Sequence, residues 1–368
     1  MRPFERLSRQ TRSQTVRIAN REVETRGLST GLWTDVYHHA MTRMQFTSIV
    51  HRGLIALGLF GTSLGAQARS DTSIIGAVPD GAVLTVTPRR PEIGSLVLLS
   101  FRRANGSSDS IQSVTGWMAG EPLHFRMDST GTERAFGAVP LEATDSVVAR
   151  VVLHLASGAA DSLRLAIVVP HRVTATVTAA RGGPARRLRV SKVFTTRPDS
   201  LTQARIEREN AEARAVGRHA HQTAELWTQP FIRPRASRIT SPFGSGRVFN
   251  GRLTSSHGGV DFAGQPGDPV RAANRGVVAL VDNFFLAGNV VYLNHGGGVV
   301  TGYFHLTQAT VAVGDTVERG QEIGIVSATG RVTGPHLHWS ARYGEHTFDP
   351  MGLIELTSVV ERPRRARR

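Results

Sequence analysis

Short apolar runs separated by glycine-containing turns predict antiparallel β structure in the first half of the chain. Between residues 78 and 193 the clearest of these runs are Ala82–Thr87, Leu96–Phe101, Val147–Leu153 and Leu163–Val169. Their length and spacing are typical of a β-sandwich. We therefore predict an N-terminal immunoglobulin-like β-sandwich domain over residues 75–195.

The next segment changes to a helical pattern. Ser200–Arg214 is rich in helix-forming residues and places acidic residues ahead of arginines at helical spacing, with Asp199 or Ser200 available as the N-cap. These features predict a short helical linker over residues 196–230.

The third region, residues 231–356, returns to glycine-rich β patterning. Its strand candidates are Val277–Val281, Asn289–Leu293, Val299–His305 and Glu322–Val326. We predict a C-terminal antiparallel β domain, so that the chain as a whole is mainly β. The arginine-rich residues 357–368 predict a basic, disordered tail.

The N-terminal residues 1–68 have the pattern of an export signal. Positively charged residues precede the apolar run Gly53–Phe60, which is too short to span a membrane stably, and small residues follow up to Ala68. We predict cleavage after Ala68, no transmembrane segment in the mature chain, and a periplasmic or extracellular, envelope-associated protein. The first forty residues are either an extended positive region or follow from a misassigned start codon, with Met41 or Met44 as the true start.

Composition narrows the chemistry that the chain can perform. Cysteine is absent, which excludes disulfides, thiolate zinc sites and cysteine catalysis, so any metal must be held by nitrogen and oxygen ligands. The net charge is +15, but the excess is concentrated in the first 68 residues and in the C-terminal arginine run. A mildly basic protein of this kind favours an anionic polymer such as a cell wall, and we predict no nucleic-acid partner.

A His-x-His pair near the C-terminus is the first candidate for a functional site. On a strand, His336 and His338 point to one face while Leu337 and Trp339 pack on the other. The preceding Gly334-Pro335 predicts a turn that leads the strand into a site. The pair by itself is weak evidence for a metal.

A second segment supplies the missing ligands. His257 and Asp261 are four residues apart with two glycines between them, which suits a tight loop that leads into a strand. Together with one imidazole of the His-x-His pair they would form a three-ligand zinc site whose fourth position is open to water, as catalysis requires. His305 and the other imidazole of the pair, His336, suit proton transfer, with their individual roles left open.

Five segments resemble the lysostaphin-type zinc metallopeptidases in order and in spacing. They are Ser241–Gly244, His257–Asp261, Gly288–Gly296, Tyr303–Leu306 and Gly330–Trp339. The resemblance covers about residues 239–349, a third of the chain.

The resemblance implies one zinc ion on His257, Asp261 and His338, with His305 and His336 catalytic. It also implies an endopeptidase that cleaves the cross-bridges or stem peptides of peptidoglycan. One feature departs from the family: some members place a tyrosine in the loop before the first ligand, and the corresponding loop Arg247–Arg252 contains none.

The resulting hypothesis is a secreted zinc endopeptidase acting on peptidoglycan, with an N-terminal domain that positions it and contacts wall or envelope partners. Two alternatives are a non-catalytic activator of cell-wall amidases and an exported peptidase of glycine-rich proteins. The first would be expected to have lost ligands, whereas here every ligand and both further histidines are present.

The remaining histidines are not predicted to bind metal. His219 and His221 also form a His-x-His pair, but residues i and i+2 of a helix do not share a face. Structural roles are predicted for four further histidines and for one acidic residue before a proline: His124, His154, His171, His295 and Asp349.

Overall fold

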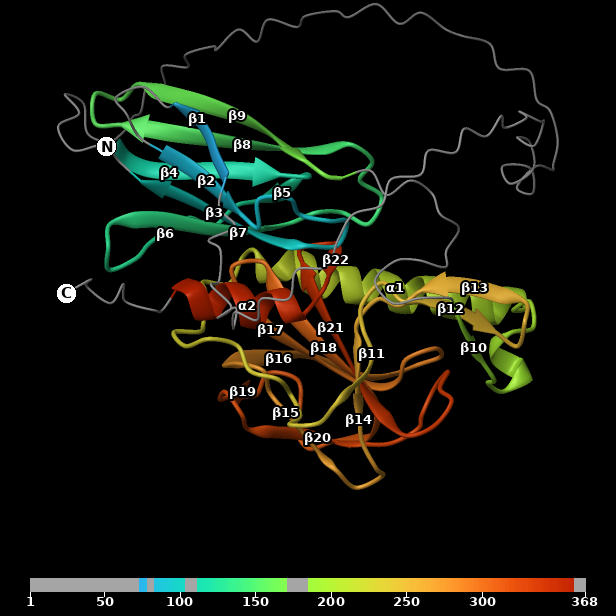
Figure 1. Cartoon of the computed structure of the whole chain (residues 1–368). Coiled ribbons are helices and arrows are strands. Elements are labelled where there is room, and N and C mark those ends of the chain that lie inside the picture. The colour runs from blue at the N-terminus through green and yellow to red at the C-terminus, as the bar shows by residue number, and fades with distance from the viewer. Residues whose placement is uncertain (1–72, 78–82, 103–110, 171–184, 361–368) are drawn as a thin grey trace, which may run out of the picture. The chain divides into compact units, whose positions relative to one another are not determined.

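The computed structural model describes residues 73–77, 83–102, 111–170 and 185–360 (Figure 1). The predicted signal sequence, its cleavage site after Ala68, and His171 lie outside these residues. All the described residues belong to one unit, Gln67–Arg368. Within the described ranges, no helix combines the length and the apolar character needed to cross a membrane.

Two antiparallel sheets form the N-terminal part. One has the strand order β1-β2-β3-β7-β6 and the other β5-β4-β8-β9. Their inner faces share one hydrophobic core, because alternate side chains of strands such as β8 point inward. The strands are β1 Ser73–Ala77, β2 Val83–Thr87, β3 Leu96–Arg102, β4 Ile111–Met118, β5 Glu121–Pro122, β6 Arg126–Met127, β7 Thr132–Ala138, β8 Ser146–Leu155 and β9 Ala160–Val168.

The first of these sheets is buried on both faces where it meets the C-terminal part. Leu96 and Leu98 of β3 belong to the same core as Trp227 and Phe231, which lie beyond the linker helix. The apolar run of β3 is therefore nearly continuous, since both of its faces exclude water. This shared core joins the two β regions directly.

A ten-stranded antiparallel sheet forms the C-terminal part, with the main order β11-β14-β21-β18-β17-β16-β19. The four strands predicted from the sequence are all present within it. The strands are β11 Ile239–Ser241, β14 Val260–Ala263, β15 Pro269–Arg271, β16 Gly276–Phe284, β17 Gly288–Gly296, β18 Val299–Ala309, β19 Thr316–Val317, β20 Glu322–Val326, β21 His336–Tyr343 and β22 His346–Phe348.

A small fourth sheet, β10-β12-β13, stands beside the site. β10 (Arg186–Leu188) pairs in parallel with β12 (Gly246–Phe249), which pairs with β13 (Leu253–Ser256). The amide of Asn250 bonds both the N–H and the C=O of Val190, at 3.0 and 2.9 Å, and so holds the chain after β10. Residues 186–188 were predicted to belong to the sandwich, and that assignment is wrong, because the free edge of β12 attracts them.

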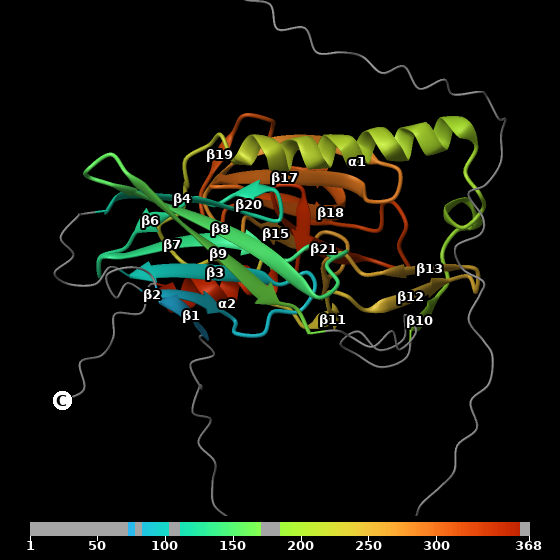
Figure 2. The same ribbon diagram turned by 90° about the horizontal axis from the view of Figure 1, so that it is seen from above.

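Helix α1 (Ser200–Ala220) confirms the predicted linker helix and its cap. The Asp199 carboxylate accepts the N–H of Thr202 at 2.7 Å. The helix continues past the helix-rich run Ser200–Arg214 because Ala213, Gly217 and Ala220 extend its buried stripe. It lies along β16, β17 and β18 (Figure 2).

Gly217 is where α1 approaches the sheet most closely. A Cβ at this position would lie 1.9 Å from the carbonyl oxygen of Gly344. We expect Gly217→Ala to destabilise the protein by about 1–3 kcal/mol, although alanine favours an isolated helix by about 1 kcal/mol. Urea unfolding measures the change, with Ala211→Gly on the exposed face as the control for helix propensity. Stabilisation by Gly217→Ala would show that α1 does not pack this closely.

Helix α2 (Met351–Val360) was not predicted. Asp349 initiates it, since its carboxylate accepts the N–H of Met351 at 3.1 Å, which fits its predicted structural role. Leu353 and Leu356 are buried in the core, and the buried Thr357 hydroxyl accepts the N–H of Phe231 at 3.0 Å. Residues 357–360 are therefore helical and do not belong to the tail, and residues 361–368 lie outside the described part.

His295 on β17 is fully buried, away from the other histidines of the sheet. Its Nδ1 donates to the Arg275 carbonyl at 2.7 Å, and its Nε2 lies 2.8 Å from the Thr301 hydroxyl. Burial lowers its pKa from 6.5 to about 4, against the opposing effect of the hydrogen bond to Arg275. The side chain is therefore neutral in the folded protein at pH 7.

This pKa predicts an acid-sensitive fold. The unfolded chain takes up a proton near pH 6.5 and the folded chain only near pH 4, so stability falls as the pH drops between these values, by about 3 kcal/mol in total. Urea unfolding from pH 7 to 4.5 measures the slope. In His295→Gln, the free energy of unfolding should depend less steeply on pH, by about one proton. Equal slopes in the two proteins would contradict the low pKa of His295.

Candidate metal centre

Three neighbouring strands bring the predicted site residues together. Asp261 on β14 lies directly opposite His338 on β21, and Phe304 on β18 lies opposite the same His338. His305, the next residue of β18, and His257, just before β14, therefore reach one region at the centre of the sheet. His336 lies two residues before His338, on the same face of β21.

Three donor atoms form a nearly equilateral triangle. The distances among His257 Nε2, Asp261 Oδ1 and His338 Nδ1 are each 2.9 Å. These are the three residues within the described part of the chain that could hold a metal ion together. Donors about 2.0–2.2 Å from a tetrahedral zinc ion stand roughly 3.3 Å apart, which is close to this spacing.

The tautomer of the His257 ring shows why a cation fits here. Its Nδ1 donates to the Pro242 carbonyl at 2.9 Å, so in the neutral ring Nε2 presents a lone pair to the Asp261 carboxylate. Two acceptor atoms at 2.9 Å repel each other unless a cation lies between them. The donor set of two imidazoles and one carboxylate is one that zinc prefers.

Gly259 allows the ligands to approach. A Cβ at this position would lie 2.6 Å from Nε2 of His338 and 2.5 Å from the Trp339 carbonyl oxygen. The two glycines between His257 and Asp261 thus provide more than a flexible turn, because the second leaves room for the third ligand.

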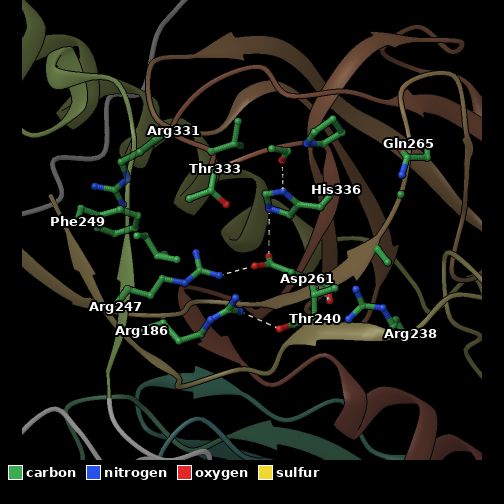
Figure 3. A pocket seen from close by; sticks show the side chains of 16 residues that line it. Arg186, Arg238, Thr240, Arg247, Phe249, Asp261, Gln265, Arg331, Thr333 and His336 are labelled. Carbon is green, nitrogen blue, oxygen red and sulfur yellow. Dashed lines mark hydrogen bonds and ion pairs between the residues drawn. The ribbon is translucent and has the colours of Figure 1, made fainter.

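Charge and burial keep the ligands in the forms that bind metal. Burial lowers the pKa of His338 to about 4, so the ring is neutral at pH 7. Burial alone would raise the pKa of Asp261, but its interactions with His257 and His338 outweigh it and hold the pKa well below the ordinary value. The second oxygen of Asp261 pairs with Arg247, as Figure 3 shows.

His305 adopts a left-handed backbone, with φ of 62°. This conformation is uncommon for a residue with a side chain and often occurs at functional sites. Nδ1 of His305 donates to the Thr329 carbonyl at 2.8 Å, which leaves Nε2 as an acceptor, and the ring lies 5.9 Å from that of His338. Burial, then the neighbouring His336 and His338, lower the pKa of His305 well below its ordinary value.

His336 lies on the outer side of the triangle. Its Nδ1 donates to the Gly334 carbonyl at 2.8 Å, and its Nε2 is 3.6 Å from Asp261 Oδ1 (Figure 3). Its ring centroid lies 4.9 Å from that of His305. The two histidines thus present acceptor nitrogens beside the same three ligands.

Two cavities meet at this cluster. One, of about 280 Å³, is lined by Asp261 and His336, and the other, of about 340 Å³, by His257, His305 and His338. Helix α1 forms a wall of the second cavity through Ile206, Glu209, Asn210 and Ala213. The linker helix therefore borders the cleft.

Arg247 is the contact that sequence reasoning missed. It belongs to the segment before the first ligand in which no tyrosine was found, and it reaches a metal ligand directly. The only sign of this contact in the sequence was the absence of a tyrosine from that segment. Backbone carbonyl groups orient His257, His305 and His336. They belong to Pro242, Thr329 and Gly334, and the sequence does not reveal this role because every residue type has a carbonyl group.

Among the described residues, the other histidines do not join the metal cluster. His219 bonds the carbonyl of Ala215 on the exposed face of α1, whereas His221 bonds the Glu121 carboxylate at 2.8 Å. His124, for which a structural role was predicted, has its Nε2 2.8 Å from His221 Nδ1, where the two β regions meet.

Comparisons with known proteins agree with this geometry. Residues 255–350 match the sequence model of Peptidase family M23. The chain is 44% identical over 103 residues to the peptidoglycan DD-endopeptidase ShyA of Vibrio cholerae serotype O1, which is 28% of this chain and 24% of that protein. It is 39% identical over 117 residues to the DD-carboxypeptidase/endopeptidase Mpg of Neisseria meningitidis serogroup B, 32% of this chain and 27% of that protein. The chain thus spans about a quarter of the length of these curated relatives.

A solved structure extends the likeness in fold. A chain from Pseudomonas aeruginosa described as a peptidase M23 covers 72% of this chain and 95% of its own length, with a TM-score of 0.51 and 24% identity. The similarity in fold therefore reaches beyond the 96 residues of the family match. Residues 255–350 thus match peptidase family M23, and His257, Asp261 and His338 within them form a candidate zinc site of the kind typical of that family.

Proposed function

We propose that the chain is a secreted zinc endopeptidase that hydrolyses peptide bonds in the cross-links or stem peptides of peptidoglycan. The observation that carries the proposal is the completeness of the cluster: three metal donors and two further histidines with open Nε2 atoms lie together where two cavities meet. The Vibrio and Neisseria relatives are both named as endopeptidases, which supports the reaction, and the name of the Vibrio protein supports peptidoglycan as the substrate.

The protein residues divide the work of hydrolysis. Bound at the three donors, zinc supplies a Lewis acid that polarises a carbonyl and makes water more acidic. In the reaction the oxygen of water adds to the carbonyl carbon, the C–N bond breaks, and the amine leaves with an added proton. Nε2 of His305 and Nε2 of His336 take the proton from water and deliver one to the amine. Arg247 pairs with the second oxygen of the Asp261 carboxylate and so fixes its position.

We propose three domains for the mature protein. They are an immunoglobulin-like sandwich within residues 75–195 and before β10, a helical linker over residues 196–230, and the peptidase domain from residue 231 through α2. The two N-terminal sheets and their shared core support the first. The sandwich positions the peptidase domain and contacts wall or envelope partners.

Export follows from the same proposal, because peptidoglycan lies outside the cytoplasmic membrane. The signal pattern before Ala68 supports it. Mass analysis of the exported protein should give Arg69 as the N-terminal residue, and an intact Met1 would contradict it.

A digestion experiment tests the activity. The full chain is incubated with purified sacculi and, separately, with a glycine-rich protein, with and without a zinc chelator, and the products are analysed by mass spectrometry. We expect new muropeptides that the chelator suppresses. Absence of cleavage together with stimulation of an added amidase would favour a non-catalytic activator, and cleavage of the glycine-rich protein alone would favour an exported peptidase of proteins.

A further inference from the structure

Four arginines surround the cavity on the Asp261 side of the metal cluster. This arginine pocket has a volume of about 280 Å³ and is formed by Arg186, Arg238, Arg247 and Arg331. Figure 3 shows the side chains of Arg186 and Arg247 extending from one side toward Thr240 and Asp261. Asp261 is the only carboxylate among the residues that line the pocket, and it is already a metal ligand.

The backbone places two of these positive charges side by side. Arg186 of β10 is the direct partner of Arg247 in the parallel pairing with β12. Like charges in directly opposed positions destabilise a sheet. The fold therefore bears a repulsion that an anion in the pocket would relieve.

Arg331 adds a third charge without a carboxylate of its own. Its guanidinium carbon lies 4.4 Å from the ring centroid of Phe249, a cation–π contact that does not itself use the N–H donors. Burial lowers the pKa of Arg331, and the charge of Arg247 lowers it further. Within the described ranges of the chain, no ion pair joins Arg331 or Arg238 to an acidic residue.

The position of the pocket indicates what kind of anion it takes. Arg247 and Arg331 also line the second cavity, where His257, His305 and His338 lie. A peptide whose scissile bond lies at the metal cluster would therefore place its next residues against the arginines. Guanidinium groups bind carboxylates through two parallel N–H···O bonds, a geometry that a neutral chain cannot use.

We propose that the arginine pocket binds a free carboxylate of the substrate, beside the scissile bond. The enzyme then selects cross-links whose residues carry carboxylates over neutral glycine bridges. This inference rests on the proposed function and specifies the substrate of that same site.

Two matched peptides test the inference. Both contain the same scissile bond, and the flanking residue carries a free carboxylate in one and a carboxamide in the other. We expect the full chain with zinc to prefer the carboxylate peptide by about 10- to 100-fold in kcat/KM, since a hydrogen-bonded charge contributes at this level. The preference should lie mainly in KM, because the carboxylate is bound in the ground state and the transition state alike.

Two independent variants and one control complete the test. In Arg331→Gln and in Arg186→Gln, the ratio of kcat/KM for the carboxylate peptide to kcat/KM for the carboxamide peptide should fall toward one. The zinc content should stay at one ion per chain. Arg252→Gln removes an equal charge from an exposed position outside the pocket and should keep the full preference.

The outcomes separate this inference from the proposed function. Equal cleavage of both peptides by the unaltered protein, or faster cleavage of a glycine peptide, would overturn the carboxylate pocket and leave the endopeptidase intact. A preference that survives in both glutamine variants would also overturn it. Failure to cleave any peptide or sacculus would contradict the proposed function and therefore also this inference.

Discussion

Replacement of His338 by alanine is expected to leave the chain folded, without bound zinc, and at least about 1,000-fold less active on peptidoglycan. The variant removes one corner of a triangle whose three sides are each 2.9 Å, so His257 and Asp261 remain as only two donors. Two donors do not form the three-ligand site that catalysis requires. Metal analysis after dialysis and muropeptide release from sacculi measure the two losses.

The matched control for this variant is His219→Ala. His219 is an exposed histidine of α1 whose ring bonds only the Ala215 carbonyl. This variant should keep one zinc per chain and full activity. One zinc per chain in His338→Ala would refute the ligand assignment, whereas unfolding of that variant, detected by circular dichroism, would call for the same measurements on Asp261→Asn.

Much of this site could be predicted from local pattern. Alternation along a strand is a short-range property, so the placement of His336 and His338 on one face, with Leu337 and Trp339 buried behind them, follows from the residues alone. The short loop between the remaining two ligands is likewise local. Donor type and the absence of cysteine then restrict the metal to nitrogen and oxygen ligands.

Other parts depend on contacts between distant residues. The pairing of Asp261 with His338 is set by the register of β14 against β21, 77 residues apart. The left-handed φ of His305 arises where β18 leaves its partner β21, and nothing in a histidine predicts it. The contact of Arg247 with a ligand is invisible in the sequence for the same reason.

The fold shows the same limit at its junctions. Helix α2 has the apolar composition of a strand, and it is helical because Asp349 begins it and its leucines fill a core made by other elements. β10 was assigned to the wrong sheet because an open edge on β12 decides its pairing. Local propensity predicts elements well when they make their own core, and less well when another element completes them.

His305→Gln is expected to lower kcat by about 100- to 10,000-fold while zinc stays at one per chain. His305 lies outside the donor triangle, so its removal leaves all three ligands in place. Its Nδ1 is held by the Thr329 carbonyl and its depressed pKa keeps Nε2 unprotonated at neutral pH, the form that accepts a proton. Glutamine retains polarity and similar length but cannot take up that proton. Steady-state kinetics together with metal analysis distinguish this loss from that of a ligand.

His295→Gln is the matched control, since His295 is also buried in the same sheet with a depressed pKa but does not reach the cleft. It should keep kcat when assayed well below its melting temperature. Loss of zinc from His305→Gln would show that His305 is a ligand. An unchanged kcat would show that His336 alone carries out the proton transfer. Because a ligand variant loses metal and activity together, retention of zinc with loss of kcat is the result that separates proton transfer from metal binding in this cluster.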